Sequence, residues 1–312
     1  MVDGVKGWKF NRGLDNDFMS ALDVLRKSNW FAEVLADKDL LLGIRDNYLD
    51  IYRYGQRLFQ ISRVGAELKV TTHPKYLVDP DLYRDVAFDG ERFVVADAEP
   101  LIEYYKADET LEKMKRAAAY YAGDEKKGVH RIVRENPNVL DVEIAFGRER
   151  KEAEPGVENE SKRQSNRIDI ACLEKEGDRI CLRFWEVKRY ANHELFSAAG
   201  DAKVVGQIES YRKYLRMHRD DVIDSYKRVA ANILEMCSWV PSNRKVGDLV
   251  RKLATCGDLC LDDDPFVGLV VFGYDDAQQN GKRFKTHITK LRNVIHRGDA
   301  NIQLVAGKAR RP

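Results

Sequence analysis

The sequence predicts an α/β protein in which helices flank a mixed central sheet, with a small α+β domain at the N-terminal end. Two observations predict this organisation. Up to about residue 100, one helical pattern is followed by short apolar runs separated by turn residues. After that point, helical patterns alternate with β-rich runs, and helices packed on a sheet are the usual arrangement for that order. We therefore predict an accessory helix-plus-sheet domain over residues 1–100 and a larger domain over residues 101–312.

The N-terminal elements follow from periodicity and turn residues. Asp15–Ala36 has apolar residues at helical spacing and is predicted to be a helix. Four antiparallel strands are predicted beyond it, near residues 40–46, 48–54, 57–62 and 66–71. Most aromatic side chains here are expected to form the core, because a small sheet domain needs large apolar groups. The sequence leaves open whether this domain recognises substrate, contacts a protein partner or mediates self-association.

The second domain is predicted to begin with two helices, and the second of them ends before Asn136-Pro137. Residues 147–167 have almost no apolar side chains and are expected to form a mobile loop. The predicted helices are Thr110–Tyr121, Lys127–Arg134 and stretches near 200–218, 220–236 and 283–296, and the predicted strands are Val139–Phe146, Ile168–Leu173, Ile180–Val187, Phe266–Tyr274 and 301–305.

Bulk properties exclude some classes of protein. The net charge is only +2, so attraction to nucleic acid requires local clustering of Lys and Arg. The sequence contains no secretory h-region and no apolar run long enough to span a bilayer, so we expect a cytoplasmic protein with no membrane partner.

Five scattered cysteines indicate reduced thiols. Cys237, Cys256 and Cys260 offer a partial metal-ligand set, whereas Cys172 and Cys181 lie in apolar runs and are better explained as buried hydrophobic residues.

The segment Arg167–Tyr190 carries the most informative pattern. Its two β-rich runs, joined by a turn, form a predicted hairpin that brings Asp169 to the same end as Glu186 and Lys188. Because side chains alternate along a strand, Glu186 and Lys188 share one face. Two carboxylates can hold Mg²⁺ through oxygen ligands, and a nearby lysine can orient a nucleophile and stabilise phosphate oxygens. The simpler interpretation is an ion pair at a strand end, which would contribute only about 0–1 kcal/mol to stability.

An acid on one strand, followed by acid-x-lysine on the next, resembles the PD-(D/E)XK nuclease superfamily. Asp169 matches the first part of its motif and Glu186-Val187-Lys188 the second. Gln207 and Tyr211, one helical turn apart, resemble the QxxxY motif of the RecB-type branch. The resemblance implies a restriction-endonuclease-like α-β-β-β-α-β core and some likeness to Shedu-type and mismatch-type endonucleases. It also implies catalytic roles for Asp169, Glu186, Lys188, Gln207 and Tyr211.

A metal site for Mg²⁺ (or Mn²⁺) is a further implication of the resemblance, with Asp169, Glu186 and the backbone of Val187 as ligands. The family often adds a carboxylate from the first core helix. Glu125 is the best candidate here, although a solvated glutamate at a helix start is an equal alternative. Glu143, on the predicted strand before the loop, is a weaker substitute. His130 is expected to be a helix-surface residue rather than a ligand.

Basic residues accumulate near this motif and provide candidate contacts to DNA phosphates. The candidates are Arg163, Arg167, Arg189, Lys203 and Arg212. Tyr211 also fits the buried stripe of its helix, an alternative that does not account for Gln207.

We therefore predict a Mg²⁺-dependent deoxyribonuclease, an endonuclease acting in defence, restriction or repair. The main alternative is a catalytically silent nucleic-acid-binding module or regulatory subunit on the same fold, and a third interpretation is a scaffold protein with a strand-end ion pair. Cutting both strands requires two centres, which favours a homodimer. DNA versus RNA, base preference and the mode of cutting stay open.

Overall fold

The computed structural model describes residues 9–77, 86–94, 102, 104–146, 167–240, 245–295 and 302–305. The chain divides into two compact units. Unit 1 comprises Met1–Phe10, Val142–Asp224 and Asp258–Pro312, and unit 2 comprises Asn11–Asp141 and Ser225–Gly257. This division differs from the predicted boundary near residue 100, because the chain after that point first adds two helices to unit 2. The predicted loop lies, apart from Arg167, outside the described residues.

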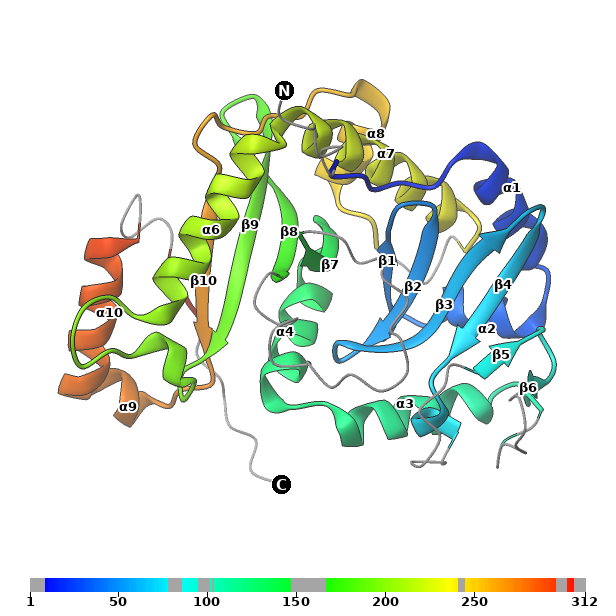
Figure 1. The fold of residues 1–312 in the computed structure, drawn as a ribbon, viewed down its shortest axis with the longest axis horizontal. Helices are drawn as coiled ribbons and strands as arrows, with labels where there is room; N and C mark the ends of the chain where they lie inside the picture. The colour runs from blue at the N-terminus through cyan, green and yellow to red at the C-terminus, as the bar shows by residue number, and fades with distance from the viewer. Residues whose placement is uncertain are drawn as a thin grey trace, which may run out of the picture. The chain divides into compact units, whose positions relative to one another are not determined.

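Unit 2 contains a six-stranded sheet in which each strand pairs antiparallel with the next one in the sequence (Figure 1). The four predicted meander strands are therefore confirmed, and two short strands extend the sheet. The strands are β1 Leu41–Ile44, β2 Tyr48–Arg53, β3 Gln56–Val64, β4 Glu67–Thr72, β5 Val86–Phe88 and β6 Phe93–Val94.

The helices of unit 2 include α1 Asn16–Leu25, α2 Asn29–Ala36, α3 Thr110–Tyr121, α4 Asp124–Glu135 and α8 Asp248–Cys256, with the 3-10 turn η1 at Pro74–Leu77. The prediction of a single helix over Asp15–Ala36 is wrong in one respect, because the helix is interrupted between α1 and α2. The Ser28 hydroxyl donates to the Leu25 carbonyl oxygen at 2.6 Å at the break, a side-chain bond that competes with helix continuation.

The core of unit 2 is aromatic, as predicted. Trp30 is 1% exposed and contacts Phe31, Phe59 and Phe88 at ring-centroid distances of 5.1–5.4 Å. A buried ion pair between Arg45 and Asp141 adds a charged element to this core.

Unit 1 is built on a five-stranded mixed sheet of order β11-β10-β9-β8-β7. The strands are β7 Val139–Ala145, β8 Arg167–Glu176, β9 Arg179–Arg189, β10 Val267–Phe272 and β11 Ile302–Val305. Residues of β7 from Val142 onward belong to this unit. β8 pairs antiparallel with β9, whereas β10 runs parallel to both β9 and β11. The predicted hairpin and the mixed sheet are thus present.

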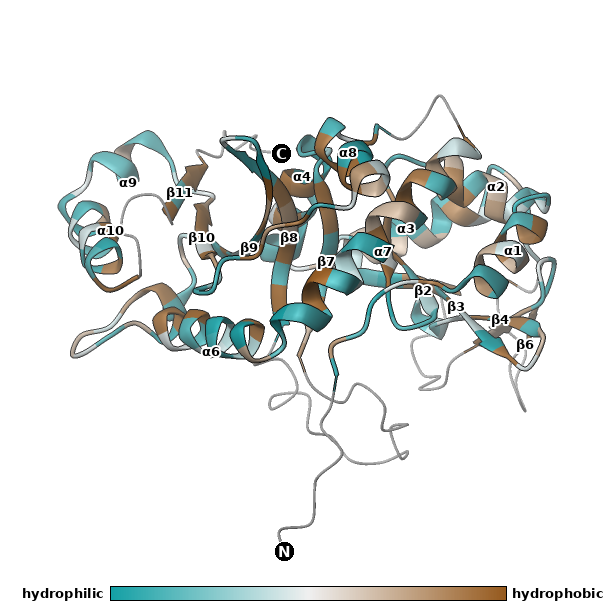
Figure 2. Ribbon diagram, turned by 90° about the horizontal axis from the view of Figure 1, so that it is seen from above, coloured by the Kyte–Doolittle hydropathy of each residue, from teal (hydrophilic) through white to brown (hydrophobic). Residues whose placement is uncertain are grey.

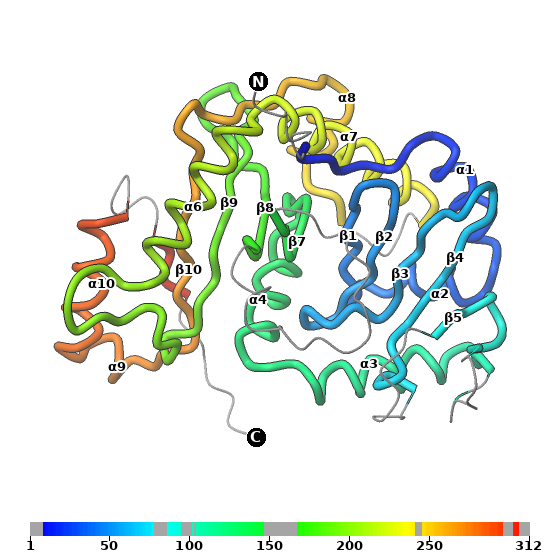
Figure 3. The backbone as a smooth tube through the Cα atoms, in the orientation of Figure 1, coloured from blue at the N-terminus to red at the C-terminus, as the bar shows by residue number. Residues whose placement is uncertain are grey.

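Parallel strands need a long return connection, and α6 Lys203–Met217 lies within the connection from β9 to β10 (Figure 3). The other helical segments are η3 His193–Leu195, the start of α7 Arg219–Ser238, α9 Asp276–Asn280 and α10 Lys282–Val294. α9 and α10 lie near the β10 side of this sheet (Figure 1).

Strand β10 contains no charged or polar side chain and is buried at each of its residues (Figure 2). Gly268 of β10 lies directly against Trp185, its register partner on β9. A Cβ atom at position 268 would lie 2.4 Å from Trp185 Cζ3, so only glycine fits this contact without displacement.

Candidate functional site

The candidate site forms where the β8–β9 ladder ends. The paired residues run from Glu176 and Arg179 at the turn to Ile170 and Trp185. One residue beyond, the Asp169 carboxylate accepts a hydrogen bond from the Val187 backbone amide at 2.9 Å. The Asp169 carboxylate is thereby held against the peptide segment between Glu186 and Lys188.

Glu186 and Lys188 form an ion pair on β9. The two residues lie two positions apart, and Lys188 Nζ is 2.7 Å from Glu186 Oε1. They are 3% and 7% exposed, and Asp169 is 7% exposed. Removing charges from water is costly unless they are paired and hydrogen-bonded, so this is not an ordinary surface ion pair.

A third carboxylate, Glu194, belongs to the same network and was not predicted from the sequence. It lies in η3, directly after β9, and its Oε2 is 2.9 Å from Lys188 Nζ. Its other oxygen is 2.5 Å from Lys203 Nζ, at the start of α6. Burial alone would raise the pKa of Glu194, but hydrogen bonds from Lys203 and Lys188 lower it to about 2. Glu194 therefore stays ionised and links the end of β9 to α6.

Tyr211 fastens α6 to the start of β8. It is 3% exposed, and its hydroxyl donates to the Arg167 carbonyl oxygen at 2.7 Å, two residues before Asp169. The pKa of Tyr211 is raised mainly by burial and also by the negative charges of Glu186, Asp169 and Glu194. The phenol stays neutral and is within electrostatic range of the carboxylates, so it occupies both the buried stripe and the surroundings of the site.

Gln207 lies one turn before Tyr211 on α6 and is half-buried. Its Oε1 atom is buried and has no hydrogen-bond partner among the described residues. An unsatisfied buried carbonyl oxygen costs free energy, so this atom is a natural position for a water, an ion or a substrate donor.

The two further carboxylate candidates occupy different places. Glu125 lies in the first turn of α4, in unit 2. Glu143 lies on β7 in unit 1, on the strand that neighbours β8, and is buried with a backbone φ of 54°. Left-handed backbone is unfavourable for glutamate and is often retained at functional sites. Glu143 thus belongs to the unit that carries Asp169, whereas Glu125 does not.

His130 is not on the helix surface, contrary to expectation. It is 3% exposed in unit 2, and its Nδ1 accepts from the Tyr54 amide at 3.2 Å. Burial, with Arg134 and Arg53 nearby, lowers the pKa of His130 to about 4. The side chain is a neutral part of the unit 2 core.

The donor set near Asp169 suits a hard divalent cation in kind. It offers the carboxylates of Asp169 and Glu186 and the backbone at Val187. Among the described residues, no group of three or more His, Cys, Asp and Glu side chains is placed to hold a metal ion. Asp169, Glu186 and a backbone oxygen provide only two such side chains, so this set would need water or substrate oxygens to complete the coordination of a cation.

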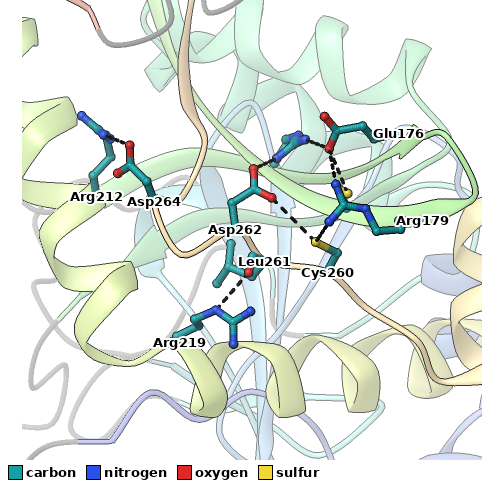
Figure 4. Close-up of polar contacts among 10 residues, drawn as sticks. Glu176, Arg179, Arg212, Arg219, Cys260, Leu261, Asp262 and Asp264 are labelled. Carbon is teal, nitrogen blue, oxygen red and sulfur yellow. Dashed lines mark hydrogen bonds and ion pairs between the residues drawn. The ribbon is translucent and has the colours of Figure 1, made fainter.

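The five predicted phosphate contacts differ in exposure and in ion pairing. Arg163 lies outside the described residues, whereas Arg167 and Arg189 have exposed positions at the open end of the hairpin, where β8 begins and β9 ends. Lys203 has a side chain that is 62% exposed and is paired with Glu194. Arg212 differs, because it is buried and forms ion pairs with Glu209 and Asp264. Figure 4 shows the contact with Asp264. The placement of Arg212 favours a structural role.

Cys260 belongs to unit 1, whereas Cys237 and Cys256 belong to unit 2. The Cys260 backbone forms an isolated parallel β-bridge with that of Cys181 on β9, and both thiols are free. The Cys260 sulfur contacts Arg179 and Asp262 (Figure 4). Burial raises the pKa of the Cys181 thiol to about 12, so this thiol stays protonated at neutral pH. A protonated thiol is a poor metal ligand.

Comparisons with protein-family models, curated proteins and solved structures find no match to this chain. Within the described part of the chain, every helix is too short or too polar to cross a bilayer.

Proposed function

We propose that this chain is a metal-dependent nuclease that hydrolyses DNA phosphodiester bonds, on a core of the PD-(D/E)XK type. One observation carries the proposal: Asp169 lies against the ion pair of the acid-x-lysine motif. Its carboxylate accepts a hydrogen bond from the Val187 backbone amide, and Lys188 pairs with the Glu186 carboxylate. The order of the sheet also supports it, since an antiparallel hairpin followed by a helix and a parallel strand is the arrangement that such a core requires. Mg²⁺ or Mn²⁺ is the proposed cofactor.

In this proposal Asp169, Glu186 and the Val187 backbone hold the cation, and a role for Glu143 stays a prediction. A role for Glu125 stays a prediction. Such a cation, when bound, would lower the pKa of a water molecule and so favour the hydroxide nucleophile, and it would offset charge on the phosphate.

Lys188 contributes a compact positive charge beside the scissile phosphate. Its ion pairs with Glu186 and Glu194 limit the motion of that ammonium group. Tyr211 positions the start of β8, which carries Asp169.

The experiment measures cutting of covalently closed circular DNA, linear duplex, single-stranded DNA and RNA, with Mg²⁺, Mn²⁺ or EDTA. We expect cutting with metal and none with EDTA. Lys188→Ala should reduce the rate at least about 10²-fold, the usual effect of removing one stabilising group from a transition state. Lys175→Ala is the matched control, because Lys175 is an exposed lysine at the other end of the same hairpin.

Asp169→Asn gives a second test, since it changes the charge and keeps the shape. Thermal unfolding establishes that each variant is folded. Metal-dependent cutting that survives in both folded variants contradicts the proposal. DNA binding without any cutting supports the alternative of a silent binding module on this fold. A homodimer and a protein partner for the N-terminal sheet stay predictions.

A further inference from the structure

Helix α10 is strongly basic although the chain as a whole is nearly neutral. Its 13 residues include Lys282, Arg283, Lys285, Lys290 and Arg292 and no acid. The net charge of the whole chain is +2, so the rest of the chain is slightly negative. Because the net charge is low, attraction to nucleic acid requires local clustering of Lys and Arg, and α10 contains such a cluster.

The two faces of α10 are distinct. Phe284, Ile288 and Leu291 form its buried stripe, and the Phe284 ring lies 5.0 Å from that of Tyr190, just after β9. The exposed residues on the other side include four cations, and none of the four has an ion-pair partner among the described residues; they are Lys282, Arg283, Lys285 and Lys290. In the same unit, Arg183 and Arg212 are both neutralised by acids. The exposed charges of α10 are therefore available to an external anion.

A pocket of about 250 Å³ lies between α10 and the segment that follows Glu194. Its polar lining includes Ser197, His287 and Asn293, and its charged lining consists of Lys290 and Asp201. This volume is below the usual range for a whole drug-sized ligand, so it suits one small polar group.

The pocket adjoins the candidate site through the chain itself. Leu195 of the pocket directly follows Glu194, which binds Lys188. Phe196 is next, with the Arg283 guanidinium 4.9 Å from its ring centre and the His287 ring 4.8 Å away. These contacts hold the basic face of α10 beside the segment that leads away from β9.

His287 is suited to such a pocket as a neutral group. Burial, with Lys290 and Arg283 nearby, lowers the pKa of His287. Its imidazole is therefore an uncharged N–H donor at neutral pH, so the positive charge of this surface comes from the lysines and the arginine.

We propose that α10 is a phosphate-binding surface for a nucleic-acid backbone, with Arg283, Lys285 and Lys290 as its contacts and the adjoining pocket receiving one phosphate. That the polyanion is DNA rests on the proposed function. The new element is the surface of the protein that holds the DNA backbone. Contacts of this kind are independent of base sequence and weaken steeply with salt.

The test uses the full chain in EDTA, so that binding is measured without cutting. Fluorescence anisotropy of a labelled 20-base-pair duplex is followed over a range of salt concentrations. The variant is R283Q/K285Q/K290Q, and the matched control is K69Q/R251Q/K252Q, which removes three exposed charges from unit 2. We expect the variant to bind at least about tenfold more weakly at low salt, and its salt slope to fall by about 0.9 for each phosphate that the protein no longer neutralises.

Unchanged affinity and slope in the α10 variant, or an equal weakening in the control, would overturn the inference. So would weaker binding to phosphatidylglycerol vesicles with no change in DNA binding, because the partner would then be an anionic membrane. If the wild type never cuts DNA with Mg²⁺ or Mn²⁺ but the α10 variant alone binds DNA more weakly, the proposed function fails and this surface stands. If Lys188-dependent cutting is observed but the α10 variant binds DNA normally, the proposed function stands and the inference about α10 fails.

Discussion

At the scale of single residues, the charge on Lys188 is balanced by Glu186 and Glu194, and Glu194 gives this network a pH dependence. The folded-state pKa of Glu194 is lowered from 4.5 to about 2, so its ionised form stabilises the fold above about pH 4.5. That contribution disappears as pH falls from about 4.5 towards 2. We therefore expect the difference in unfolding free energy between wild type and Glu194→Gln to shrink over this interval, as measured by urea unfolding at several pH values.

Glu67→Gln is the control for this experiment, because Glu67 is exposed at the start of β4. Its difference from wild type should stay near zero at each pH. A Glu194→Gln difference that does not change between pH 5 and pH 2.5 would mean that the two lysines do not hold this carboxylate in solution.

The residues of the candidate site were predicted from the sequence only in part. Strand alternation placed Glu186 and Lys188 on one face, and the turn between the strands placed Asp169 near them. Glu194 was missed because it lies in a three-residue 3-10 turn with no periodic pattern. The ion pair of Arg212 with Asp264 joins residues 52 apart, so the helix sequence gives no sign that this arginine is occupied.

At the scale of elements, two glycines have opposite consequences. Gly268→Ala places a methyl group against Trp185 in the middle of the sheet, and we expect it to cost about 1–3 kcal/mol of stability. Gly206→Ala lies on the exposed side of α6 with no atom within 4 Å of the added Cβ, and we expect it to stabilise by about 0.5–1 kcal/mol. Urea unfolding measures the change in unfolding free energy for both variants. A Gly268→Ala variant as stable as wild type would contradict the close contact between Gly268 and Trp185.

Elements with a regular apolar pattern, or with turn residues on either side, were predicted from the sequence. The bounds of α3 agree at both ends, and the β8–β9 hairpin was recognised from its two apolar runs and their turn. Strands β5 and β6 span three and two residues, and α9 spans five, too few for a period to be recognised. Helix α8 was also missed, although its sequence is amphipathic.

At the scale of the whole molecule, a single cut near residue 100 is expected to disrupt folding. A fragment of residues 101–312 retains Asp141 but lacks Arg45 and Arg12, its ion-pair partners inside unit 2. Leaving one member of a buried pair uncompensated costs about 3–5 kcal/mol. We expect this fragment to lack a cooperative thermal transition by circular dichroism. A sharp transition like that of the full chain would show that the fragment is an independent domain.

The predicted boundary came from a change in sequence pattern, and patterns along a chain report local structure rather than which segments pack together. Residues 225–257 show the difference. They follow the candidate site in the sequence but belong to unit 2. Ser225 accepts a hydrogen bond from the Arg12 amide and Asn232 one from the Leu14 amide, with partners more than 200 residues away. No local signal predicts pairings of that length.

The interleaving of the two units also sets an order of events during synthesis on the ribosome. Unit 2 has all its residues once Gly257 has been made, whereas unit 1 still awaits β10 and β11. Since domains generally fold as their residues emerge, unit 2 can form while β9 still has an open edge. Residues Phe184–Arg189, which include Glu186 and Lys188, gain their parallel neighbour only when Val267–Phe272 emerges. A nascent chain would therefore carry the acid-x-lysine motif for some time before that motif has a complete sheet to hold it.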